Sequence, residues 1–207
     1  MTNETGRPTD QQHAPSPDLR PVADPRRLAL WAQGLIAAAC LVELLLAVAG
    51  GTGTWLFRAA SLPYGAVTLA AAVLFLRWLS RVRHNAEHLA PDAHRYAPAW
   101  AVGAWFVPFM MWWAPRRIVL DVDRASGGAG TVLVNLWWVA WLGKTVGMLI
   151  ARQLAPDLPV YTPAGEAVNL LAGALAVLLI RRITAAQCAR FTSSTAAVEG
   201  SGERVAT

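Results

Sequence analysis

Apolar residues dominate four long stretches of the chain, and short polar or charged segments separate them. The stretches cover residues 28–49, 62–79, 131–150 and 164–180. Each is close to the roughly 20 residues that an α-helix needs to cross about 30 Å of hydrocarbon. Apolar and polar residues do not alternate with a period of two, which argues against barrel strands. The pattern predicts an all-α membrane protein with four transmembrane helices that form two hairpins.

A fifth apolar stretch, over about residues 98–126, differs from the other four. Residues 99–117 read AWAVGAWFVPFMMWWAPRR and contain two prolines and four of the ten tryptophans of the chain. Pro108 interrupts helical hydrogen bonding and leaves two apolar pieces of about eight residues, each roughly 12 Å long as a helix. Neither piece spans a membrane alone, although neighbouring helices can accommodate a proline kink in a spanning helix.

The positions of the basic residues decide between four and five spans. If all five stretches cross and the N-terminus is inside, nine arginines lie inside and eight outside. If the fifth stretch enters and leaves on the cytoplasmic side, fifteen lie inside and only Arg58 and Arg152 lie outside, with Lys144 within a helix. Cytoplasmic loops carry an excess of Lys and Arg. The sequence therefore predicts cytoplasmic termini and a re-entrant or interfacial segment that does not cross.

The residues that flank the predicted spans complete the outline. The run PRRIVLDVDRASGG begins at Pro115, which suits a first helical turn, and ends with two glycines. It predicts a short amphipathic helix on the inner membrane surface. Residues 1–27 are rich in proline and polar side chains, and residues 191–207 are mostly small or polar. Both are predicted to be disordered cytoplasmic tails of a helical membrane domain over residues 28–190.

Charge and cysteine content exclude two further classes. The net charge is +5, but the arginines flank the apolar stretches and do not form a basic stripe interleaved with stacking aromatic residues. We therefore expect no nucleic-acid partner. Cys40 lies within the first predicted helix and Cys188 beyond the last, and neither belongs to a CxxC motif. This arrangement predicts no disulfide and no redox or zinc framework.

One short motif has the pattern of a metal site. His84–His88 reads HNAEH, the H-x-x-E-H pattern of inverted zinc proteases, in which two histidines share the metal. A third ligand is required, but Glu166 is predicted on the opposite side of the membrane and the motif is predicted in a short loop. We therefore expect solvated surface histidines, no metal and no cofactor. The sequence also contains no phosphate-binding glycine loop and no nucleophile elbow, so an enzyme is the least supported class.

Two charges fall inside predicted spans. Glu43 and Lys144 lie about 22 Å and 20 Å from the inner ends of their helices, at matching depth. Isolated charges at that depth cost several kcal/mol, so an intramembrane charge pair is one way to accommodate them. The sequence leaves two alternatives open: Lys144 can snorkel to the outer surface, and Glu43 can be protonated or face a water-filled cleft.

Several motifs resemble a known family. The bacterial membrane proteins grouped as domain of unknown function 4328 resemble this chain over roughly residues 62–190. The resemblance implies an integral membrane protein of no established activity and supplies no catalytic or ligand residues. The family pattern has an asparagine three residues after the central proline, where this chain has Met111. The motifs are W-L-x-R-x-R-x-N at 78–85, P-x-W-A-V-G-x-W-F-V-P at 98–108, Pro115, N-x-W-W at 135–138 and R-R-I-T-A-A-Q at 181–187.

These observations predict a small multi-pass protein of the bacterial inner membrane with a structural, assembly or regulatory role. We expect a surface on its inner face to bind anionic lipid headgroups of the bilayer, a membrane protein partner or a second copy of the chain. The alternative is a small oligomeric transporter or channel that uses Glu43 and Lys144. The arginines near the inner face are Arg77, Arg81, Arg83, Arg95, Arg116 and Arg117, and orientation of the protein alone explains them. The residues predicted for the inner-face surface are Trp100, Trp105, Pro108, Trp112, Trp113, Arg116 and Arg117.

Overall fold

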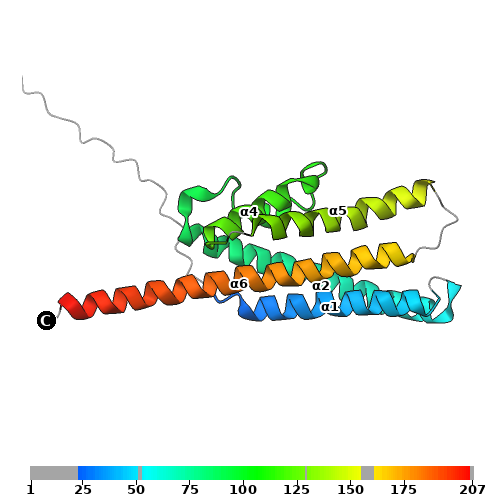
Figure 1. The fold of residues 1–207 in the computed structure, drawn as a ribbon, viewed down its shortest axis with the longest axis horizontal. Helices are drawn as coiled ribbons and strands as arrows, with labels where there is room; N and C mark the ends of the chain where they lie inside the picture. The colour runs from blue at the N-terminus through cyan, green and yellow to red at the C-terminus, as the bar shows by residue number, and fades with distance from the viewer. Residues whose placement is uncertain (1–22, 51–52, 129, 155–160, 206–207) are drawn as a thin grey trace, which may run out of the picture.

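The computed structural model describes residues 23–50, 53–128, 130–154 and 161–205 (Figure 1). Over these residues the regular elements are all helical. Four of the described helices are long and apolar enough to cross a membrane, which confirms the predicted number. They are α1 (Arg26–Val48), α2 (Trp55–Leu89), α5 (Thr131–Leu154) and α6 (Pro163–Val205).

The four long helices lie side by side along the long axis of the molecule (Figure 1). Helices α1 and α2 pack as one hairpin, α5 and α6 as a second, and α1 joins the two hairpins by packing against α6. At one end of the bundle α1 and α5 begin and α2 and α6 finish, and we call it the terminal end. At the other end α1 leads into α2 and α5 into α6, and we call it the loop end.

Helix α2 is longer than its apolar stretch. It begins at Trp55, where the Thr54 hydroxyl accepts a hydrogen bond from the backbone N–H of Phe57 at 3.2 Å. It continues to Leu89, because the residues after the apolar stretch contain no helix breaker before Pro91. The H-x-x-E-H run therefore lies on the last turns of α2, and its predicted location in a loop was wrong.

Helix α6 also extends beyond its predicted span. It continues as a helix to Val205, where the sequence predicted a disordered tail from residue 191. The chain has no proline after Pro163, so every later residue of this helix keeps the backbone N–H that an α-helix requires. Of the predicted N-terminal tail, residues 1–22 lie outside the described residues, and α1 begins at Arg26.

The chain between α2 and α4 forms only short helical pieces. They are η2 (Pro91–Ala93), α3 (Trp100–Gly103) and η3 (Met110–Trp112). Phe109, directly after Pro108, has a φ of 66°, so the backbone reverses there in a conformation that most residues avoid. We call residues 98–113 the Trp-Pro segment. Its pieces have four residues or fewer and cannot span a bilayer, so this stretch is not a fifth spanning helix.

Helix α4 (Ala114–Ala125) is the short amphipathic helix that the sequence predicted after the Trp-Pro segment. It ends in a Schellman motif, in which Gly127 has a φ of 81° and donates to the carbonyl of Arg124 at 2.9 Å. The sequence predicted this helix on the inner membrane surface, and in the structure nine of its twelve residues are buried within the protein. An apolar helix face can be covered by lipid or by protein, and here α2 and α5 cover it.

The protein core lies at the terminal end, where α4 packs against α2 and α5. Elsewhere the long helices present apolar side chains outward: Leu69 and Val139 are about two-thirds exposed. Surface this apolar, continuous along four helices, fits hydrocarbon and not water. The largest apolar side chains that are fully buried are Trp78, Leu79, Val82, Val119, Val122, Val134, Leu179, Ile180 and Ile183.

The turn between α4 and α5 yields the first prediction. Gly128 has no room for a side chain, because a Cβ there would overlap the Asp123 carboxylate. We expect Gly128→Ala to destabilise the protein by roughly 1–3 kcal/mol, the usual cost of overpacking. Gly34→Ala is the matched control, since a Cβ at Gly34 meets nothing within 4 Å. Thermal unfolding in detergent measures both, and equal melting temperatures would contradict the tight turn.

Candidate functional site

A polar network joins the four long helices toward the loop end. Each helix contributes one side chain: Glu43 from α1, Tyr64 from α2, Lys144 from α5 and Asn169 from α6. A single carboxylate oxygen, Oε2 of Glu43, accepts from the Tyr64 hydroxyl at 2.7 Å, from Asn169 Nδ2 at 2.9 Å and from Lys144 Nζ at 3.2 Å. Lys144 Nζ also donates to Oδ1 of Asn169.

Burial makes this network energetically important. Glu43 is 7% exposed, and the Lys144 side chain is 36% exposed. A single hydrogen bond between membrane helices contributes only about 0.6 kcal/mol on average. An uncompensated buried charge, in contrast, costs about 3–5 kcal/mol. The main role of the contacts is therefore to keep the Glu43 carboxylate paired, and this requires all four helices to hold their rotation and depth.

The sequence anticipated two of these four residues. It placed Glu43 and Lys144 at matching depth, and the structure brings their side chains into direct contact. It did not single out Tyr64 and Asn169. Both are polar residues within predicted apolar stretches: Tyr64 lies in the stretch 62–79 and Asn169 in the stretch 164–180. A polar residue inside an apolar stretch is the signal that could have marked them. Whether their side chains face Glu43 depends on how the helices pack, which no local sequence pattern gives.

A cavity of about 290 Å³ extends from this network toward the middle of the bundle. Its polar wall contains Glu43, Tyr64, Lys144 and Asn169, and small residues of α2 and α6 leave the space open. The ammonium group of Lys144 has three donors and two described acceptors, so one donor is free to bind a further group. The other lining residues include Ile36, Cys40, Thr68, Ala71, Phe75, Trp105, Trp137, Trp141, Ala172 and Gly173.

Aromatic rings close the far side of the cavity. Trp105 of the Trp-Pro segment contacts Trp141 with ring centroids 5.4 Å apart, Phe75 at 5.8 Å and Trp138 at 6.1 Å. The near-perpendicular arrangement of these pairs is a favourable edge-to-face geometry. The buried indole N–H of Trp105 has no hydrogen-bond partner among the described residues. The cavity therefore combines aromatic walls with the polar groups of Glu43, Tyr64, Lys144 and Asn169.

The inner-face surface predicted from the sequence does not form one continuous patch. Trp105 points into the bundle, and Nε of Arg116 donates to Oδ1 of Asn135 on α5 at 2.9 Å. Trp100 is half-buried. The exposed members of the predicted set are Pro108, Trp112, Trp113 and Arg117.

The terminal end has its own buried polar contacts. Gln187 of α6 donates to the carbonyl of Val82 at 2.8 Å and accepts from Asn85 Nδ2 at 3.3 Å. Trp78 Nε1 donates to the hydroxyl of Thr184 at 3.0 Å. On α4, Asp123 accepts from the backbone N–H of Gly130 at 2.9 Å. These contacts attach α2, α4 and the start of α5 to one another and to α6.

The metal and cysteine predictions can be compared with this geometry. His84 and His88 lie on one face of α2, while Glu87 forms an ion pair with Arg83 at 2.9 Å. Within the described residues, no group of three His, Cys, Asp or Glu side chains is placed to hold a metal ion. Cys40 and Cys188 are both free thiols.

Four spanning helices joined by an intramembrane polar network define a multi-pass helical membrane protein. The chain belongs to the family described as Domain of unknown function (DUF4328), which matches residues 27–185. This match includes α1, which lies before the region of resemblance recognised in the sequence. Comparisons with curated proteins and with solved structures found no match.

The motifs that indicated the family lie close together in the structure. Trp78 and Asn85, from the first motif, bond to Thr184 and Gln187 of the last motif. Trp105 contacts the tryptophans of N-x-W-W, whose asparagine accepts from Arg116. These separated motifs therefore describe one packing arrangement at the terminal end and in the middle of the bundle.

The intramembrane network yields the second prediction. Lys144→Met leaves the Glu43 carboxylate without a cation, and we expect it to destabilise the protein by about 3–5 kcal/mol. The double variant with Glu43→Gln removes both charges, so its destabilisation should be well below the sum of the two single effects. Arg152→Gln is the control, because it removes one positive charge from an exposed position of the same helix and should change stability little. Unfolding in denaturing detergent measures all four variants, and additive effects would contradict the pairing.

Proposed function

We propose that this chain is a non-catalytic component of the bacterial cytoplasmic membrane, with both termini in the cytoplasm, and that it acts by binding at its terminal end. The distribution of arginines supports the orientation. Among the described residues, Arg58 and Arg152 belong to the loop end, and the other arginines lie in the terminal half of the bundle. This one-sided distribution matches the excess of basic residues that cytoplasmic faces carry.

The exposed side chains near the terminal half support a binding role. Phe106 and Phe109 of the Trp-Pro segment are 73% and 76% exposed, and Trp112 and Trp113 are also exposed. Arg117 lies exposed at the start of α4, close behind them in the chain. Aromatic and arginine side chains are the types most enriched at binding surfaces and at the headgroup level of membranes. A structural, assembly or regulatory role follows, with a lipid, another membrane protein or a second copy bound at this face.

The orientation gives the third prediction. In a variant with Cys40→Ala and Cys188→Ala, single cysteines at Ala93 and Gly53 report on the two ends, since both positions are exposed. In intact cells we expect a membrane-impermeant maleimide to label Gly53→Cys and to leave Ala93→Cys unlabelled until the membrane is opened. The opposite result would reverse the topology and remove the cytoplasmic face from the proposal.

The cavity favours a second candidate function, a small transporter or channel. The cavity lies beside the Glu43–Lys144 ion pair and is lined by an aromatic cluster within the spanning helices. Intramembrane ionisable groups often mark proton or ion pathways. A structural network needs no such space beside it, and this is the observation that favours the second candidate.

A flux measurement separates the two candidates and gives the fourth prediction. If the chain conducts protons, vesicles with the wild-type protein dissipate an imposed pH gradient faster than empty vesicles, and Glu43→Gln abolishes the difference. Tyr64→Phe is the matched control, because it removes one hydrogen bond to Glu43 and keeps the carboxylate. If the chain is structural, wild-type and empty vesicles behave alike, and that result rejects the proton-conducting candidate.

A further inference from the structure

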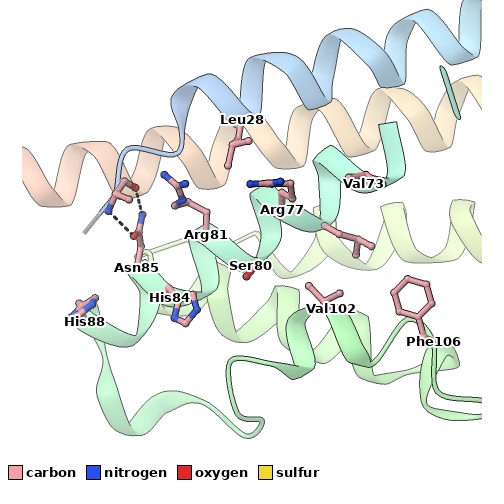
Figure 2. Close-up of a pocket in the computed structure, with 12 residues that line it drawn as sticks. Leu28, Val73, Arg77, Ser80, Arg81, His84, Asn85, His88, Val102 and Phe106 are labelled. Carbon is pink, nitrogen blue, oxygen red and sulfur yellow. Dashed lines mark hydrogen bonds between the residues drawn. The ribbon is translucent and has the colours of Figure 1, made fainter. Parts of the chain in front are cut away.

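A groove of about 590 Å³ lies at the terminal end, between α2, the start of α1 and the Trp-Pro segment. Figure 2 shows Arg77 and Arg81 on the side of α2 that faces Leu28 of α1, with Val102 and Phe106 forming the opposite wall. The protein core does not use this face of α2, because Trp78, Leu79 and Val82 point into the core instead.

The groove changes from apolar to basic along α2. Val73, Arg77, Arg81, His84 and His88 follow one another at intervals of three or four residues, so they share one face of the helix over about 22 Å. Val73, nearest the middle of the bundle, is 46% exposed. The basic side chains follow toward the terminal end, at the level where α1 begins. A phospholipid shows a matching sequence of groups, with apolar acyl chains followed by a charged headgroup.

Nothing in the lining neutralises the basic side chains. The groove-lining residues include no Asp or Glu. No described residue accepts a hydrogen bond from Arg77, and Arg81 donates to the backbone carbonyl of Asp24 at 3.3 Å. The carboxylate of Asp24 instead accepts from the backbone N–H of Arg26 at 2.9 Å. Most of the hydrogen-bonding capacity of the two guanidinium groups is therefore directed to groups outside the described protein.

We propose that this groove binds one anionic phospholipid. The phosphate lies between Arg77 and Arg81, which are one helical turn or about 6 Å apart, and each guanidinium donates to phosphate oxygens. The acyl chains extend toward the middle of the bundle along Val73, Leu76 and Phe106. His84 and Ser80 add hydrogen-bonding groups for the rest of the headgroup.

The apolar half of the groove favours a lipid over a free phosphate ion. A free anion needs only the basic part, whereas Phe106 at 73% exposed and Val73 at 46% exposed require an apolar neighbour. The groove is also continuous with the apolar outer surface of α2, where Leu69 is 67% exposed. This inference names the ligand of the terminal end and rests on the proposed binding role of that end.

Lipid binding to the full chain in neutral detergent micelles tests the inference. Native mass spectrometry measures the affinity for phosphatidylglycerol and for phosphatidylcholine with identical acyl chains. We expect tighter binding of phosphatidylglycerol, and roughly 30-fold weaker binding of it in the double variant Arg77→Gln and Arg81→Gln, since each arginine near an anionic headgroup contributes about 1 kcal/mol, or about a fivefold factor. The matched control carries Arg58→Gln and Arg152→Gln, both at the loop end, and should bind as the wild type does.

Three results would overturn the inference. The first is equal affinity for the two lipids, and the second is unchanged phosphatidylglycerol binding in the Arg77 and Arg81 variant. The third is displacement of phosphatidylglycerol by millimolar inorganic phosphate, which would identify the ligand as a free anion.

If the double glutamine variant does not fold, Val73→Ser with Phe106→Ser replaces it. That variant keeps both arginines and should weaken phosphatidylglycerol binding about tenfold, and unchanged binding would again refute the lipid. Binding in micelles does not depend on orientation, so its failure and a reversed topology are separate results.

Discussion

The shared carboxylate oxygen of Glu43 is the contact on which the packing of the spanning helices depends. Hydrocarbon provides no water to solvate a charge, so a carboxylate at this depth needs partners from within the protein. Tyr64, Lys144 and Asn169 supply them from three different helices. Because all three donors meet one oxygen, a rotation or shift of any helix breaks a contact to a buried charge. The network therefore fixes the register of helices whose apolar surfaces alone would allow many alternatives.

The terminal end is held together by different means. There α4 packs against α2 and α5, and Trp78, Val119 and Ile180 belong to one close-packed core. The amide of Gln187 connects α2 to α6 and contacts Ser126 beyond the end of α4. Amides and hydroxyls satisfy one another there, and the buried Asp123 carboxylate is held by the N–H of Gly130. This half therefore combines close packing with several separate polar contacts, whereas the loop end depends on one network around Glu43.

Much of the fold could be predicted from the sequence because membranes impose simple rules. Span length and hydropathy gave four helices, and the break at Pro108 together with the arginine positions argued against a fifth. The location of α4 could not be predicted, since an amphipathic pattern identifies an apolar face but not what covers it. Its acidic residues are the clue in retrospect: Asp123 accepts from the N–H of Gly130 and lies 4.0 Å from Arg182, contacts that favour the protein interior over an anionic membrane surface. The roles of Tyr64 and Asn169 could not be predicted for a related reason. The position of a residue in the sequence gives its depth along the helix, but it does not show which neighbouring helix the side chain faces.

The Trp-Pro segment links the two sites through neighbouring residues. Trp105 contacts Trp141 and lines the same cavity as Glu43, while Phe106 and Arg77 line the groove. Both side chains are carried by the same short turn, so a shift of its backbone displaces both. The two side chains differ in their packing: Trp105 contacts four aromatic rings, whereas Phe106 is 73% exposed. The broken stretch that cannot span the membrane therefore lines both the interior cavity and the surface groove.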